Sequence, residues 1–218
     1  MPIKRSVEIE LMFIYVTHAR ILTKIKAIIP YTSSYNLAML TKAGGRHISL
    51  QNIVYLTTDC ASWDPSYEAK FVEKINRPYL KKVDIVSIDS WFEVSGKRNP
   101  SYEEVKQSLF ATTVYNRGQN VVQQLEQLHK ATGKPVYFGG FNVPARELGL
   151  QNPWNPDVSN VLSKDVQLNG WRAYRNVLEP KPYFKGFSIW FIGSNNSTHA
   201  YQIHSQETAA VINGWYRK

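Results

Sequence analysis

The chain has 218 residues and a net charge of +9 at pH 7; 43% of its residues are hydrophobic and 20% are charged. This composition is typical of a soluble globular protein, and no apolar run is long enough to span a bilayer. The basic residues are scattered, so the charge indicates a solvated basic surface rather than a nucleic-acid-binding one. Cys60 is the only cysteine, which excludes an intrachain disulfide and a metal site built from cysteines alone.

The N-terminus imitates a signal peptide only in part. Lys4 and Arg5 precede an apolar stretch, but Glu8 and Glu10 interrupt it and no small-residue cleavage site follows. We therefore expect a cytoplasmic protein. We also expect residues 1–14 to form an atypical N-terminal segment and residues 15–218 to form one domain.

In chain order, the first predicted element is an amphipathic helix that runs into a strand. Apolar residues between Tyr15 and Ile29 recur at steps of three and four, and Pro30 ends the pattern. Residues 31–39 are mixed polar and aromatic and are compatible with a strand, which a turn-rich segment at 42–46 would follow.

The next elements alternate helix and strand. Residues 64–66 are typical of a helix N-terminus and predict a helix over 66–76. The sequence VDIVSI from Val83 predicts a buried strand. Residues 102–132 are predicted to be mostly helical, with Gly133 as the C-cap.

The last third of the chain contains a strand from Pro135, a long loop to about Leu162, and further elements. These are a helix over 165–178, a strand over 186–191 and a closing helix over 207–215. Four apolar runs therefore read as strands: 27–29, 85–88, 136–138 and 187–191. Their alternation with helices predicts the α/β class and a (β/α) barrel, or part of one, with its chemistry at the C-terminal strand ends.

Three strand motifs and the closing helix carry a resemblance to a known family. The segments are VDIVSIDSWFEV from Val83, KPVYFGGFNVPAR from Lys134, GFSIWF from Gly186 and ETAAVINGWY from Glu207. Together they resemble the C-terminal half of the retaining glycoside hydrolases with a (β/α)8 barrel, and most resemble glycoside hydrolase family 113, the endo-β-mannanases. The resemblance implies a partial TIM-type barrel containing the family's strands five to eight.

Two departures from the family pattern concern catalysis. The resemblance places the family's nucleophilic glutamate on Gly140, and the Asn-Glu pair that supplies the acid/base is absent. Retaining hydrolysis needs two carboxyl groups about 5 to 5.5 Å apart. We therefore predict that the usual catalytic glutamates are missing. Asp89 is the best substitute carboxylate, and Glu147 a weaker one, although a turn or surface role is the more ordinary use of each.

The predicted ligand is a β-linked, mannan-like polysaccharide. Aromatic rings stack on sugar rings and polar side chains bond the hydroxyls. The candidate contacts are Tyr35, Asn36, Asp89, Trp91, Asn142 and Trp190. Trp154 is a further candidate, whereas Trp171 and Trp215, on helix faces, are expected in the core.

No cofactor is predicted, and His199 and His204 have no obvious third partner for a metal site. The expected function is that of a glycoside hydrolase-like protein, with a non-catalytic carbohydrate-binding or scaffold protein as the alternative. A basic nucleic-acid-binding protein ranks lower. A half barrel would leave strand edges unpaired, so we also expect self-association or pairing with a separate N-terminal half.

Overall fold

The computed structural model describes residues 39–41, 47–49, 71–73, 75–82, 84–190 and 198–216. The chain divides into two compact units, residues 1–51 and 52–218. The predicted elements between residues 15 and 38, the candidate contacts Tyr35 and Asn36, and the expected boundary after residue 14 all lie outside the described residues.

In the first unit, strand β1 (Met39–Thr41) pairs antiparallel with β2 (His47–Ser49). Leu40 lies opposite Ile48 in this register. The two strands lie on either side of the predicted turn-rich segment at residues 42–46.

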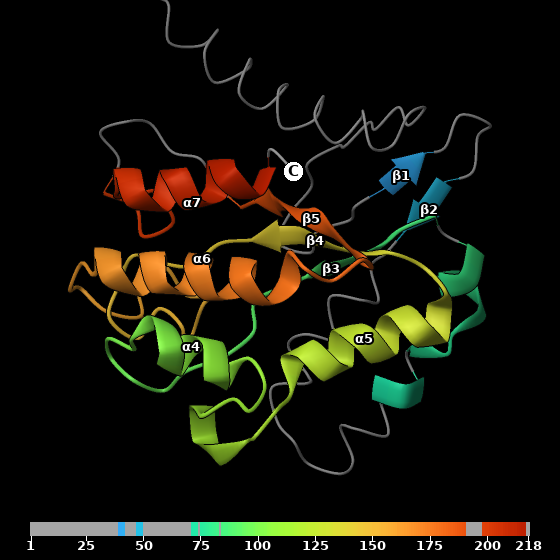
Figure 1. The fold of residues 1–218 in the computed structure, drawn as a ribbon, viewed down its shortest axis with the longest axis horizontal. Helices are drawn as coiled ribbons and strands as arrows, with labels where there is room; N and C mark the ends of the chain where they lie inside the picture. Colours follow the sequence, from blue (N-terminus) through green and yellow to red (C-terminus); the bar gives the residue numbers. More distant parts are fainter. Residues whose placement is uncertain are drawn as a thin grey trace, which may run out of the picture. The chain divides into compact units, whose positions relative to one another are not determined.

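The second unit is built on an open, three-stranded parallel sheet in the order β3-β4-β5 (Figure 1). The strands are β3 (Val86–Asp89), β4 (Val136–Phe141) and β5 (Phe184–Ile189). Parallel neighbours require crossover connections, and helices supply them here. The α/β class is thus confirmed, and three of the four predicted strands are present in the described residues.

Helices precede, separate and follow the three strands in the sequence. The 3-10 helix η2 (Pro78–Lys82) comes before β3. Between β3 and β4 the chain forms α4 (Tyr102–Ser108), the 3-10 helix η3 (Val114–Asn116) and α5 (Val121–Thr132), whereas α6 (Lys164–Leu178) lies between β4 and β5 and α7 (Gln206–Tyr216) follows β5. Helix α6 packs on both α4 and α7. Residues 71–73 and 75 are helical, in agreement with the helix predicted over 66–76.

An aromatic cluster forms the core between β4, β5 and the helices α6 and α7. Phe141 contacts Trp171 and Tyr174 edge to face at 4.6 and 4.7 Å between ring centroids, and Phe187 lies 4.5 Å from Trp215. Such rings bury large apolar areas, and edge-to-face pairs add to that stabilisation. The predicted core positions of Trp171 and Trp215 are confirmed, with 0% and 8% of their surface exposed.

Strand β4 runs through the glycine pair to Phe141, three residues beyond the apolar run predicted at 136–138. A Cβ atom on Gly139 would lie 2.4 Å from the Ser87 Oγ of β3. Glycine at this position therefore permits close approach of two neighbouring strands instead of ending one.

The prediction of a mostly helical segment over 102–132 is wrong between α4 and α5. Tyr115, Asn116 and Gly118 all have positive φ, at 52°, 55° and 64°, and a right-handed helix cannot continue through them. The C-cap prediction is confirmed, because Gly133 has φ 67° and its N–H bonds the carbonyl of His129. Helices α6 and α7 lie within a residue of their predicted bounds, and β5 begins two residues earlier than expected.

The described residues include no helix that is both long and apolar enough to cross a membrane.

Candidate functional site

The C-terminal ends of the three parallel strands meet at one edge of the sheet. Asp89 of β3 is paired with Gly140 of β4, and the Ser90 N–H and Oγ both donate to the Gly140 carbonyl at 3.1 and 2.7 Å. At the other side of β4, the Trp190 N–H donates to the Phe141 carbonyl at 3.0 Å. Gly140 is therefore a buried, strand-paired residue that has no nucleophilic side chain. Asp89 lies opposite it in the register of β3 and β4.

The Asn142 side chain makes hydrogen bonds that connect the chain segments at this edge. Its Nδ2 donates to the carbonyls of Trp190 and Tyr201 at 3.0 and 2.8 Å, and its Oδ1 accepts from the Val143 N–H and the Trp171 Nε1 at 2.8 and 3.3 Å. Asn142 is 1% exposed, and these four bonds use the ordinary capacity of its amide. The Asn142 side chain thus joins its own segment to those of Trp190, Tyr201 and Trp171. Its contact with a sugar stays a prediction.

Trp91 is buried and contacts two other aromatic rings. It meets Trp190 edge to face at 6.5 Å and Tyr201 at 5.3 Å between centroids, and only 8% of Trp91 is exposed. Trp190 is half-buried. Tyr201, which was not predicted from the sequence as a site residue, donates from its hydroxyl to the Pro153 carbonyl at 2.6 Å, and burial raises its pKa.

A second group of side chains combines two exposed aromatic rings with a largely buried ion pair. Trp154 is 54% exposed and donates from Nε1 to the Glu93 Oε1 at 3.3 Å. The Glu93 Oε2 forms an ion pair with Arg117, and the Glu93 and Arg117 side chains are only 12% and 19% exposed. The Arg117 guanidinium lies 4.7 Å from the ring centroid of Tyr115, which is 65% exposed. We call these four residues the Glu93 cluster.

Only one residue of the Glu93 cluster, Trp154, was predicted from the sequence as a ligand contact. Arg117 and Tyr115 were not predicted, because their segment was assigned to a helix. No local pattern marks them, since Arg117 is 24 residues from Glu93.

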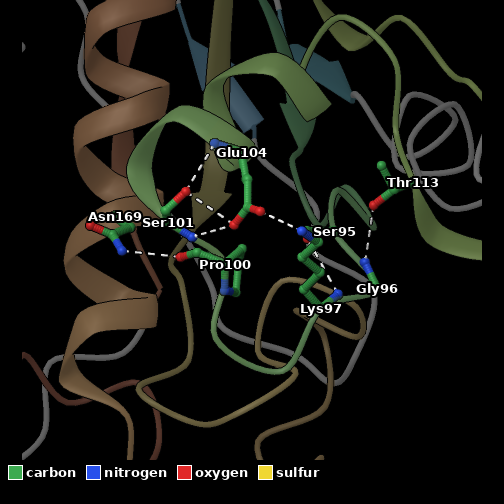
Figure 2. Close-up of polar contacts among 8 residues, drawn as sticks. All are labelled: Ser95, Gly96, Lys97, Pro100, Ser101, Glu104, Thr113 and Asn169. Carbon is green, nitrogen blue, oxygen red and sulfur yellow. Dashed lines mark hydrogen bonds and ion pairs between the residues drawn. The ribbon is translucent and has the colours of Figure 1, made fainter.

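The loop that follows β3 is fixed on three sides (Figure 2). The Gly96 N–H donates to the Thr113 Oγ1 at 3.3 Å, Lys97 forms an ion pair with Glu104, and Asn169 of α6 donates to the Pro100 carbonyl at 3.0 Å. The Thr113 N–H also donates to the Val94 carbonyl at 3.1 Å. The segment with Tyr115 and Arg117 is therefore held against the segment with Glu93.

Helix α4 contributes to the same anchoring. Ser101 and Glu104 form a capping box, in which each side chain accepts from the other residue's backbone N–H. Hydrogen bonds from Lys97 and from Ser101 lower the pKa of Glu104 to about 2. Glu104 thus stays ionised through the physiological pH range and holds Lys97 in place.

The long loop between β4 and α6, which carries Trp154, is tied to the same segment. Glu147 accepts from Arg98 and from Asn99, each at 2.8 Å, and Ser163 donates to the Asn99 Oδ1 at 2.7 Å. These hydrogen bonds from Asn99 and Arg98 lower the pKa of Glu147. Glu147 is therefore ionised near neutral pH, where it links the loop to Arg98 and Asn99 and is unsuited to act as a proton donor.

Four titratable side chains described near this edge, Glu93, Glu147, His199 and His204, take part in ion pairs or hydrogen bonds within the protein. Glu93 and Glu147 are each paired with an arginine. The His204 ring bonds the His199 carbonyl at 3.0 Å, and the His199 Nδ1 accepts from the Tyr201 N–H at 3.3 Å. Among the described residues, no group of three or more His, Cys, Asp or Glu side chains could hold a metal ion.

Comparisons with known proteins give a structural likeness only. No protein-family model matches the sequence, and no curated protein matches it. The fold is similar to the GH113 β-mannanase of Alicyclobacillus acidocaldarius, solved in complex with ManMIm, at 16% identity and a TM-score of 0.47. It is also similar to a GH113 β-1,4-mannanase solved as a complex, at 13% identity and a TM-score of 0.44. Each match covers 66% of this chain and 42% of the mannanase, so the chain spans less than half of either relative.

Proposed function

We propose that this chain is a glycoside hydrolase-like protein, with part of a (β/α) barrel, that binds a β-linked, mannan-like polysaccharide without retaining hydrolysis. The observation that carries the proposal is the exposed Trp154 ring, held beside the Glu93–Arg117 ion pair next to the C-terminal sheet edge. An exposed aromatic face beside fixed polar groups is the combination that sugar-binding sites use.

The parts of the Glu93 cluster have complementary uses toward a sugar. The indole of Trp154 offers an apolar face to the C–H face of a pyranose. Glu93 accepts hydrogen bonds from hydroxyl groups, and Arg117 donates them. Because Glu93 and Arg117 neutralise each other, the cluster suits an uncharged glycan better than a polyanion.

The same arrangement disfavours hydrolysis by the retaining mechanism. That mechanism needs one carboxylate to attack and a second carboxyl group to exchange the proton. Gly140 supplies no carboxylate, while Glu93 and Glu147 are held by Arg117 and Arg98. The pairing of Glu93 and Glu147 with arginines therefore supports the non-hydrolytic part of the proposal.

Calorimetric titration with mannohexaose, cellohexaose and laminarihexaose tests the proposal, together with a reducing-sugar assay on β-mannan. We expect binding of at least one hexaose, no sugar release, and an affinity loss of about tenfold in Trp154→Ala. Phe110→Ala is the matched control, because Phe110 is an exposed aromatic residue, at 46%, just after α4. Absence of binding to every hexaose would exclude the binding proposal, and sugar release by the natural protein would exclude its non-hydrolytic part.

A further inference from the structure

The segment that carries Tyr115 adopts an unfavourable backbone conformation. Tyr115 and Asn116 are consecutive non-glycine residues in the left-handed region, with φ of 52° and 55°. L-amino acids with a Cβ avoid this region, and bulky side chains avoid it most. Such conformations persist only where the surrounding structure fixes them, and they are enriched at ligand-binding sites.

The surrounding structure does fix this segment. The Gly118 N–H donates to the Thr112 carbonyl at 3.0 Å, and the Thr112 N–H donates to the Gln119 carbonyl at 2.9 Å. Gln119 is 1% exposed and its Nε2 donates to the Gln124 Oε1 of α5 at 2.7 Å. The ends of the loop are thus closed on each other and anchored in the protein.

The strained conformation does not bury the Tyr115 ring. With 65% of its surface exposed, Tyr115 is the most exposed of the large hydrophobic residues that the structure describes. Its one described ring contact is with the Arg117 guanidinium, which lies 4.7 Å from the ring centroid. Packing into a core therefore does not explain why the chain holds a tyrosine in this conformation.

The position of Tyr115 within the Glu93 cluster suggests that its ring contacts a ligand. Trp154 bonds Glu93, Glu93 pairs with Arg117, and Arg117 stacks on Tyr115. Two exposed aromatic rings thus lie at the two ends of a row of contacts whose middle is polar. A chain of sugars can stack on both rings while its hydroxyl groups bond the polar residues between them.

We propose that Tyr115 is a second stacking platform, so that the ligand is an extended oligosaccharide that reaches both Tyr115 and Trp154 and not a single sugar. This inference rests on the proposed carbohydrate binding. It predicts that affinity rises with chain length, and that Tyr115 contributes to the part of the affinity that the added sugars provide.

The test compares affinities for mannobiose through mannohexaose, or for the same lengths of whichever hexaose binds, between the natural protein and Tyr115→Gly. Glycine tolerates positive φ, so this variant removes the ring while keeping the loop conformation. We expect unchanged affinity for the disaccharide and a loss of about three- to tenfold for the hexasaccharide. The Tm should not fall, because strain is relieved. Tyr115→Phe should retain the affinity.

Tyr102→Ala is the matched control, since the half-buried Tyr102 ring also contacts a cation, the Lys106 Nζ at 5.6 Å, on α4. An equal loss at every chain length, no loss at any length, or a Tm lowered by several degrees would overturn the assignment of Tyr115. If Trp154→Ala weakens binding while Tyr115→Gly does not, only this inference fails. If the natural protein binds no oligosaccharide, both proposals fail.

Discussion

Replacing Asn142 by alanine should destabilise the protein much more than the loss of one ordinary surface amide. Asn142 joins the end of β4 to the segment after β5 and to the turn before α7, through the carbonyls of Trp190 and Tyr201. Alanine cannot donate to either carbonyl. The variant removes the Asn142 donor from both carbonyls and the Asn142 acceptor from the Val143 N–H and the Trp171 Nε1, in a place where Asn142 itself is 1% exposed.

The size of the effect follows from the desolvation of these groups. A buried polar group that loses its partner costs about 1–3 kcal/mol. Two carbonyls at the lower half of that range give about 2–4 kcal/mol, since water can enter part of the vacated space. For a chain of this length we expect a Tm lowered by roughly 4–16 °C.

Thermal unfolding followed by circular dichroism measures this change, with urea unfolding as a check on the free energy. Asn169→Ala is the control, because the half-buried Asn169 donates a single bond to the Pro100 carbonyl at 3.0 Å. Its expected cost is about 1 kcal/mol. A change in Asn142→Ala no larger than in Asn169→Ala, with the same cooperativity, would refute the argument that Asn142 is a structural brace.

Two further predictions concern the sheet and the loop after β3. Gly139→Ala should lower the free energy of unfolding by about 1–3 kcal/mol, because its Cβ would meet the Ser87 Oγ at 2.4 Å, and Ser87→Ala should restore part of the loss; an undiminished urea midpoint would contradict this. Because the folded pKa of Glu104 is lowered to about 2, its contribution to stability is present above the unfolded value of about 4.3 and disappears as the pH falls toward 2. Glu104→Gln should therefore lower the Tm at pH 6 but hardly at pH 2; an equal decrease at both values would count against the ionic role.

Several local features of this protein follow from the sequence alone. Apolar periodicity predicted α6 and α7 to within a residue, and Gly133 marked the end of α5. The alternation of strands and helices predicted the α/β class. These predictions hold because amphipathic periods, caps and apolar runs depend on residues a few positions apart, whose interactions form whatever the rest of the chain does.

The candidate site depended on the tertiary structure. Glu93 and Arg117 are 24 residues apart, and Arg98 and Glu147 are 49 apart, so only folding pairs them. Asn142 is a residue type that often contacts sugars, yet in the folded chain it is buried and its side-chain amide makes four hydrogen bonds within the protein. Tyr115 lies in a segment that was predicted to be helical, but it has positive φ and an exposed side chain in a loop closed by hydrogen bonds between Thr112, Gly118 and Gln119. Long-range contacts decide which polar groups remain free for a ligand, and local sequence patterns do not contain them.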